Sequence, residues 1–288
     1  MLSPLFQPQP GRLPNIAIFM SGSGSNAEQF IQYLNRQSSP FVKIQALITD
    51  NPEGSRTREL GKLYGLPVIE HDIRAFYAER GEKRVSIATE AGQRIREEWT
   101  ERLRDLIRPL ELDFAVFAGF VPLTNISRDL PCLNVHPGDL TYMKDGARLL
   151  VGLHTLPIER AILEGLDYLR SSVIVVEPYG GSGKEMDSGS LLGVSQKVPI
   201  DFQGASLEEL CACASQRPEK RPKGGWQDRL EEIAKHNQER LKEQGDWTVL
   251  PPCVKAFAEG RYATDEQGNL FFDGKQTQTV EFPSETLI

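Results

Sequence analysis

Short apolar runs alternate with segments of helical spacing through the first two thirds of this 288-residue chain. The helical segments 26–35 and 56–64 have the length of crossovers between parallel strands. This alternation predicts an α/β fold, a doubly wound and mostly parallel sheet with inserted loops, in one domain rather than two. The strands expected from the apolar pattern are 15–20, 113–118, 132–135, 171–177 and 190–198.

Two longer helical patterns lie outside these crossovers. The first, 84–108, carries an apolar stripe at three- and four-residue steps through Ala88, Ala91, Ile95, Trp99, Leu103 and Leu106. The second, 226–243, follows a basic segment rich in Pro at 217–223. An exposed linker is the favoured interpretation of that segment, and a loop that contacts phosphate or a partner is the alternative.

Bulk composition excludes several classes of protein. A formal net charge of -7 argues against a general nucleic-acid binder, which needs a basic face. No apolar run reaches the length of a membrane span, so no membrane partner is expected. Residues 1–14 hold neither the basic cluster nor the apolar core of a signal peptide, which predicts a cytoplasmic location. None of these properties predicts an oligomeric state.

Four cysteines, at positions 132, 211, 213 and 253, are too few to form a disulfide framework for a chain of this length. Cys211 and Cys213 lie two residues apart in an expected helix, without a second Cys or His pair of the kind that completes a zinc site. Thiols packed in a reduced protein are the favoured interpretation, and no metal is expected.

A glycine-rich turn follows the first strand. Ser21-Gly-Ser-Gly-Ser-Asn26 leads directly into a helical segment, and a strand, turn and helix start of this kind present backbone N–H groups to phosphate. Ser23, Gly24, Ser25 and Asn26 are the expected phosphate-binding residues. Residues 22–27 also match the Gly-x-Gly-x-x-Ala fingerprint of dinucleotide binding, with Asp50 at the end of the next strand as the ribose-binding acid. A dinucleotide-binding oxidoreductase therefore remains an alternative.

The motif Asn134-Val-His-Pro137, together with Asp187, supplies the groups needed to move an acyl group onto an amine. Asn134 and His136 are two residues apart in an expected strand, so both side chains leave the same face. An amide donates to a carbonyl oxygen that gains negative charge, and an imidazole exchanges protons near neutral pH. A carboxylate favours the charged imidazole. A strand-to-turn corner at His136 and a turn-forming Asp187 are the structural alternatives.

Five short motifs follow one another along the chain in an order that is similar to that of a known family. They are Ser-Gly-x-Gly-Ser-Asn at 21–26, Ala-Gly-Phe at 118–120, Leu-Asn-x-His-Pro at 133–137, Gly-Leu-His at 152–154 and Asp-x-Gly at 187–189. As an ordered set they resemble the folate-dependent formyltransferases, and within that family the glycinamide ribonucleotide transformylases. The resemblance covers most of the chain from Asn15 onward.

The resemblance implies further elements and a division of the chain. Strands are implied at 42–49, 67–70 and 196–200, a helix at 158–165, and a last helix with a closing hairpin between 247 and 274. Residues 1–14 are expected to form a tail, and 15–288 a single domain. Within that domain, 15–118 would form the phosphate-binding half, 119–205 the catalytic and folate-binding half, and 206–288 the C-terminal helices and hairpin.

The resemblance also implies a donor, an acceptor and the roles of the site residues. The formyl donor would be 10-formyltetrahydrofolate, and the acceptor the primary amine of a phosphorylated small molecule such as glycinamide ribonucleotide. Asn134, His136 and Asp187 would be catalytic, with His154 near the site. Asp246 would contact the acceptor, and Val121, Leu123 and Met186 would wall the pteridine pocket.

Departures from the family pattern leave the substrate open. Gly138-Asp-Leu-Thr141 stands where the family has Ser-Leu-Leu-Pro, the loop over 138–152 is longer, and 178–185 is extended. These loops would shape the acceptor and folate pockets. A sugar-nucleotide N-formyltransferase, a formyltetrahydrofolate deformylase with water as the acceptor, and a non-catalytic folate-binding protein remain alternatives.

Overall fold

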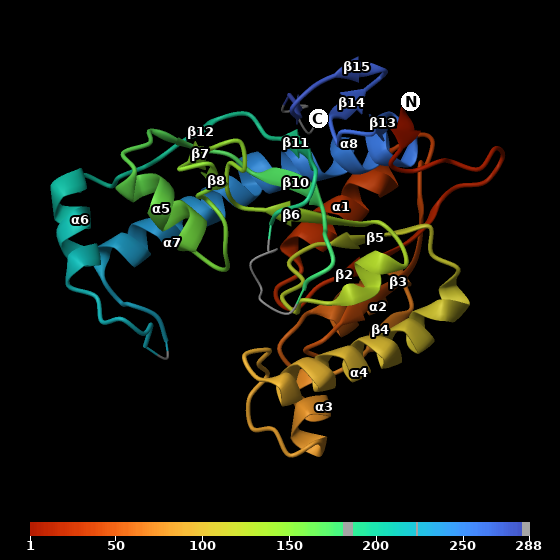
Figure 1. Cartoon of the computed structure of the whole chain (residues 1–288), viewed down its shortest axis with the longest axis horizontal. Coiled ribbons are helices and arrows are strands. Elements are labelled where there is room, and N and C mark those ends of the chain that lie inside the picture. Colours follow the sequence, from red (N-terminus) through yellow and green to blue (C-terminus); the bar gives the residue numbers. More distant parts are fainter. Residues whose placement is uncertain (181–186, 223, 284–288) are drawn as a thin grey trace.

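The computed structural model describes residues 1–180, 187–222 and 224–283. Its centre is an eight-stranded sheet in the order β16-β11-β10-β6-β5-β2-β3-β4 (Figure 1). In that order the strands are β16 (Val280–Glu281), β11 (Leu191–Val194), β10 (Ser172–Val175), β6 (Cys132–His136), β5 (Phe114–Phe117), β2 (Asn15–Phe19), β3 (Lys43–Thr49) and β4 (Val68–Glu70). From β6 to β4 every neighbouring pair is parallel, and β10 is antiparallel to β6 and β11. The predicted doubly wound, mostly parallel sheet is confirmed.

Helices cover both faces of this sheet. Alternate residues of β2 point to opposite sides, with Ile16 and Ile18 in one core cluster and Ala17 and Phe19 in the other. The first cluster also receives α1 (Ser25–Arg36), α2 (Thr57–Tyr64) and α8 (Trp247–Ala258). The second receives α3 (Ile73–Glu79) and α4 (Glu90–Ile107). Strands buried on both faces explain why the apolar runs in the sequence are continuous rather than alternating.

The helix expected from residue 84 begins six residues later, at Glu90. Thr89 is its N-cap, and the Thr89 side chain accepts a hydrogen bond from the backbone N–H of Gly92 at 3.1 Å. The predicted helix start at residue 84 was therefore wrong. It followed from apolar spacing, which carries no information about the cap at Thr89. The short helix α3 was not anticipated, although Asp72 caps it by accepting from the N–H groups of Arg74 and Ala75.

A third cluster, which we call the helical lobe, lies beside the sheet. It is built from α5 (Leu156–Leu163), α6 (Leu207–Ser215) and α7 (Arg229–Leu241) together with β9 (Tyr168–Leu169) and β12 (Val198–Pro199). The strand implied at 196–200 is β12, which pairs with β9 and not with the central sheet. The central strand expected to reach residue 198 ends at Val194, because Val198 and Ile200 are buried in the lobe.

The C-terminal third of the chain returns to the sheet through one long helical run. The helix α7 continues without a break through a π-helical turn, Lys242–Asp246, into α8 (Figure 1). A small sheet follows, in which β1 (Ser3–Pro4) pairs with β13 (Tyr262–Thr264), and β14 (Leu270–Phe272) pairs with β13 and β15 (Lys275–Gln276). The N-terminal tail therefore lies on the domain. No helix in the described part of the chain is both long and apolar enough to cross a membrane.

Candidate active site

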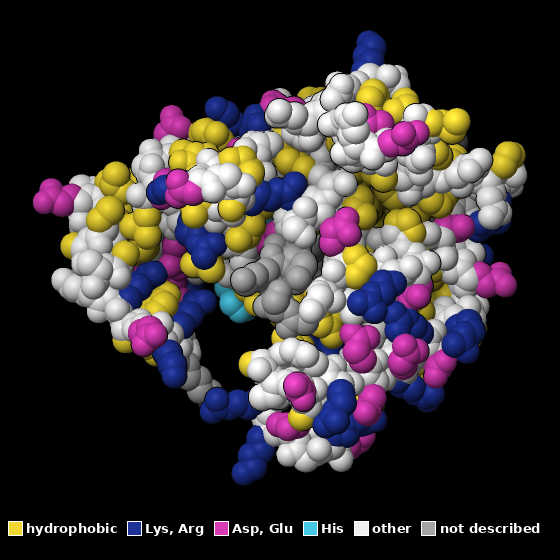
Figure 2. All heavy atoms as spheres, in the orientation of Figure 1, with side chains coloured by type: hydrophobic (Ala, Val, Ile, Leu, Met, Phe, Trp, Pro, Cys, Tyr) yellow, Lys and Arg dark blue, Asp and Glu magenta, His cyan; other side chains and the backbone are white. Residues whose placement is uncertain are grey.

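A cavity of about 400 Å³ lies where the carboxyl ends of β2, β5 and β6 meet. The chain passes from β2 to β3 on one side and returns through α3 and α4 to β5 on the other, which makes this edge a topological switch point. Ligands of open α/β sheets bind at such points. Gln238 of α7 lies at the cavity together with Lys242 and Asp246 of the π-helical turn, and residues 117–124 also line it. Figure 2 shows the molecular surface hollowed between the helical lobe and the region of α3 and α4, with a histidine side chain on the wall.

The glycine-rich turn forms one end of the cavity. Ser23, Gly24, Ser25 and Asn26 all line it, as expected of a phosphate-binding turn. Gly24 is the N-cap of α1 and has a φ of 67°, a left-handed conformation in which no side chain caps the helix. A Cβ at Gly24 would lie 2.3 Å from Cε of Met20. The first N–H groups of α1 therefore lack a side-chain acceptor and lie at the cavity wall, where a helix start favours an anion.

Asn134 and His136 both line the cavity, as their two-residue spacing in β6 predicts. The backbone of Asn134 is fixed by its place between Phe117 of β5 and Ile174 of β10. Its carboxamide has no hydrogen-bond partner among the described residues, in contrast to the imidazole of His136. The Asn134 side chain is thus held on a rigid strand with its donors available to a ligand.

The imidazole of His136 is buried between two acceptors. Its Nε2 is 2.7 Å from the carbonyl oxygen of Leu150, and its Nδ1 is 3.5 Å from Oδ1 of Asp187. The two side chains are only 4% and 7% exposed. A neutral imidazole carries one N–H and can donate to only one of these oxygens, whereas the imidazolium donates to both. The two acceptors therefore fix the orientation of the imidazole ring at the cavity.

Asp187 adopts a left-handed backbone conformation with a φ of 59°. Its Oδ2 accepts a hydrogen bond from the backbone N–H of Gly152 at 3.1 Å, while Oδ1 faces His136. Asp and Asn tolerate this conformation better than other residues with a side chain. The turn that was the structural alternative for Asp187 is real, and it directs the carboxylate at His136.

Asp246 lies at the cavity from the π-helical turn and is only 5% exposed. Its carboxylate accepts from the Asn26 amide at 2.8 Å and from the Ser171 hydroxyl at 2.5 Å. Burial raises the pKa of Asp246, and these hydrogen bonds oppose the rise. Trp247 Nε1 donates to the other end of the Asn26 side chain at 3.0 Å. The side chain of Asn26 therefore joins the glycine-rich turn to α8, which leaves its backbone N–H for a ligand.

The expected folate-pocket residues are partly placed. Val121 and Leu123 line the cavity, and Val121 is 47% exposed. Met186, the third expected wall residue, lies outside the described residues, as do 181–185 of the extended loop. His154 lines the cavity from an exposed loop, and its carbonyl oxygen accepts from the Gln238 amide at 3.1 Å.

Several cavity residues were not anticipated. Lys242 is the only lysine or arginine among the described residues that line the cavity, and Gln238 lies one helical turn before it. Tyr179 and Thr124 are buried in the opposite wall. Lys242 is four residues before Asp246, so helical spacing from Asp246 could have indicated it. No comparable sequence signal marks Tyr179 or Thr124.

The structure argues against the dinucleotide alternative. Asp50 would have to offer a free carboxylate to a ribose, yet it is buried and is not among the residues that line the cavity. Its Oδ1 accepts from the Ser21 hydroxyl at 2.5 Å, and burial raises its pKa. Ser21 in turn accepts from the N–H of Val121 at 2.9 Å. Asp50 therefore ties the turn after β2 to the turn after β5.

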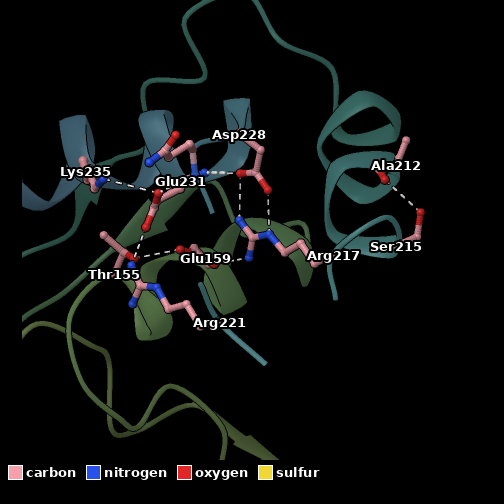
Figure 3. A network of polar contacts seen from close by, with 10 residues as sticks. Thr155, Glu159, Ala212, Ser215, Arg217, Arg221, Asp228, Glu231 and Lys235 are labelled. Atoms are coloured by element: carbon pink, nitrogen blue, oxygen red, sulfur yellow. Dashed lines mark hydrogen bonds and ion pairs between the residues drawn. The ribbon is translucent and has the colours of Figure 1, made fainter. Parts of the chain in front are cut away.

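Two arginines of the basic segment are paired with carboxylates of the helical lobe (Figure 3). Arg217 donates to both carboxylate oxygens of Asp228, at 2.7 and 2.8 Å, and also to Glu159 of α5. Arg221 pairs with Glu231 of α7, whose side chain is fully buried. Residues 218–222 are exposed, as the linker interpretation predicts, but the guanidinium groups of Arg217 and Arg221 are held by carboxylates of the lobe.

The cysteines behave differently from one another. Cys132 and Cys253 are buried, and burial raises the pKa of both thiols. Cys211 is exposed on α6, and Cys213 is partly exposed. The expectation of packed thiols therefore holds for Cys132 and Cys253 and not for Cys211. Across the described residues, no three His, Cys, Asp or Glu side chains are grouped as a metal site.

The mostly parallel central sheet with its flanking helices has the fold of the formyltransferases. The chain is similar to phosphoribosylglycinamide formyltransferase from Coxiella burnetii, with 19% identity and a TM-score of 0.60 over 94% of this chain and 100% of that one. The same enzyme from Anaplasma phagocytophilum gives 17% identity and a TM-score of 0.57 over 94% and 99% of the two chains.

A second kind of enzyme shares the fold. A formyltetrahydrofolate deformylase from Pseudomonas syringae is 12% identical with a TM-score of 0.57, covering 91% of this chain and 66% of that one. No protein-family model matches the sequence. At identities this low, the structural matches show that the fold is shared. Evidence for the reaction comes from the residues of the cavity.

Proposed function

We propose that this protein transfers a formyl group from 10-formyltetrahydrofolate to the primary amine of a phosphorylated small molecule, with glycinamide ribonucleotide as the first candidate acceptor. The observation that carries the proposal is the meeting of two features in one cavity. An uncapped helix start at 23–26 lies at one end, and Asn134, His136 and Asp187 lie along the wall. The first suits phosphate, and the second suits acyl transfer.

The proposed reaction begins with attack of the acceptor amine on the formyl carbon. Negative charge then develops on the formyl oxygen, where the Asn134 carboxamide donates a hydrogen bond and the His136 imidazolium supplies positive charge. Because Leu150 holds the Nε2 proton of His136, the imidazole contributes charge rather than a freely exchanging proton. The proton lost from the amine passes to the Asp187 carboxylate and then to N10 of tetrahydrofolate as the carbon–nitrogen bond breaks.

The acceptor phosphate is proposed to bind at 23–26, with Lys242 as the nearby positive charge. Glu239 pairs with Lys242 at 2.7 Å, so the ammonium is already held at the cavity edge. Asp246 is only 5% exposed, and each of its carboxylate oxygens already accepts one hydrogen bond, from Asn26 or from Ser171. We therefore assign Asp246 chiefly to shaping the phosphate turn.

A deformylase is the second candidate, supported by the fold shared with the Pseudomonas syringae enzyme. In that reaction water replaces the amine, so a phosphate-binding turn would have no ligand. The test offers 10-formyltetrahydrofolate with glycinamide ribonucleotide, with an amino-sugar nucleotide, and with no acceptor, and follows products by mass spectrometry. Formylated glycinamide ribonucleotide supports the proposal. Formate released at full rate without an acceptor would favour the deformylase.

A further inference from the structure

The loop between β6 and α5 holds both members of the His136–Asp187 pair. Leu150 accepts from Nε2 of His136, and the N–H of Gly152 donates to Oδ2 of Asp187. The same loop contains a small hairpin of β7 (Met143–Lys144) and β8 (Ala147–Arg148). This hairpin lies in the segment 138–152, where the sequence departs from the formyltransferase pattern.

Arg148, the last residue of the hairpin, reaches the backbone on either side of Ser188. Its Nη1 donates to the carbonyl oxygen of Asp187 at 2.6 Å and to that of Gly189 at 2.9 Å. A single nitrogen thus bridges two carbonyl groups that flank one residue. Burial lowers the pKa of Arg148, and the charge of Asp187 opposes that effect. The guanidinium is accordingly held where it has lost much of its water.

These contacts constrain a residue in the left-handed backbone conformation. Asp187 has a φ of 59°, which residues with a side chain rarely adopt, and its Oδ1 is 3.5 Å from Nδ1 of His136. That distance is already long for a hydrogen bond, so a small rotation of the 187–189 backbone would separate the two groups. Arg148 blocks this rotation from the backbone side, and Gly152 holds the carboxylate from the other.

We propose that Arg148 of β8 is a positioning residue that holds Asp187 against His136. This inference rests on the proposed role of Asp187 in formyl transfer. Arg148 is not among the residues that line the cavity, so its effect passes through Asp187. Loss of Arg148 should lower kcat while leaving the KM for folate nearly unchanged.

The test is a double-mutant cycle on formyl transfer. Arg148→Met keeps most of the apolar stem and removes the donor, and it should lower kcat by roughly 10–100-fold, the scale of an ångström-sized misplacement. If Arg148 acts through Asp187, then Arg148→Met in the Asp187→Asn background should slow the reaction no further. Because one nitrogen makes both bonds, Arg148→Lys should recover part of the lost rate.

Lys144→Met is the matched control, because Lys144 is on the same hairpin and pairs with Glu164 rather than with 187–189. Its kcat should stay within about twofold of the unmodified protein. An Arg148→Met rate equal to that of Lys144→Met, or losses that multiply in the double variant, would overturn the inference alone. Full activity of Asp187→Asn would overturn both the inference and the proposed role of Asp187.

Discussion

Buried carboxylates are stabilised in opposite ways in the helical lobe and in the cavity. In the lobe, Glu159 and Glu231 are 3% and 0% exposed and are paired with Arg217 and Arg221 respectively. In the cavity, Asp246 is 5% exposed and accepts only from neutral donors, the Asn26 amide and the Ser171 hydroxyl. The first group is held by ion pairs with arginine, whereas Asp246 makes no ion pair with another described residue.

Carboxyl groups of the two regions accordingly have pKa values shifted in opposite directions. The hydrogen bond from Arg217 lowers the pKa of Asp228. Burial works against ionisation of Glu231, yet bonds from the Gln227 N–H, Arg221 and Lys235 outweigh it and lower its pKa as well. Burial instead raises the pKa of Asp246. A fully paired network serves stability, whereas a buried acid without a permanent counter-charge is typical of a functional site.

The largest expected effect is on catalysis in the cavity. Asn134→Ala and His136→Ala should each slow formyl transfer by roughly 10²–10⁴-fold, the loss expected for an oxyanion donor or a general acid or base. Thermal melting should change little for Asn134→Ala, because no described residue binds its carboxamide. Asn35→Ala and His236→Ala, at surface positions, are the controls. Activity within about twofold of the unmodified protein for both cavity variants would reject the assignment.

The helical lobe should show the reverse, a loss of stability without a loss of chemistry. Arg217→Met leaves Glu159 and Asp228 without their shared counter-charge, which should lower the free energy of unfolding by about 3–5 kcal/mol. Urea unfolding measures the loss, and kcat at a temperature where the variant is folded should be retained. Glu232→Gln breaks the exposed Arg229–Glu232 pair and should cost at most about 1 kcal/mol. An equal loss of unfolding free energy in Arg217→Met and Glu232→Gln would contradict the stabilising role of the buried ion pairs in the lobe.

A smaller effect is expected at the glycine-rich turn. Gly22 has open space where a Cβ would be built, whereas a Cβ at Gly24 would collide with Met20. Gly22→Val should therefore fold and should weaken acceptor binding by roughly tenfold, the loss of about one charge-assisted hydrogen bond. Calorimetric titration should show unchanged folate binding.

Ser23→Ala separates backbone from side-chain recognition at the same turn. Its hydroxyl is exposed and reaches only Ser25, at 3.5 Å, so removing it should leave acceptor affinity nearly unchanged. A loss equal to that of Gly22→Val would assign the phosphate to side-chain hydroxyls. Equal loss of folate and acceptor binding in Gly22→Val would contradict a separate phosphate site.

The smallest expected effect is the pH dependence of stability. Asp228 and Glu231 have lowered pKa values in the folded state, so their stabilisation is present above the ordinary carboxyl range and is lost as the pH falls through it. The raised pKa of Asp246 acts in the opposite sense, because its contribution is greatest in acid and is lost as the pH rises through that pKa. Urea unfolding at neutral pH and at about pH 4 compares Asp228→Asn with Asp246→Asn. Between neutral pH and acid, the free energy of unfolding of Asp228→Asn should fall less than that of the unmodified protein. The free energy of unfolding of Asp246→Asn should fall more than that of the unmodified protein.

Sequence alone was sufficient for most of the central sheet and for some of the residues that line its edge. Apolar runs predicted β2, β5 and β6 within one or two residues, because strands buried on both faces tolerate few polar side chains. The two-residue spacing of Asn134 and His136 placed both at one cavity, because strand geometry leaves no other outcome. These are local properties of the chain.

Tertiary structure decided what each polar group does. Arg217 and Arg221 read as an exposed basic segment, yet they are bound by carboxylates of α5 and α7 that the sequence separates from them by up to 58 residues. Lys242 and Asp246 reach the cavity only because α7 runs through a π-helical turn into α8. The contacts of His136 with Leu150, and of Asp187 with Arg148, join loops whose pattern carries no periodic signal. Periodicity encodes which face of a strand or helix is buried, but the pairing of charges across loops depends on distances that exist only after folding.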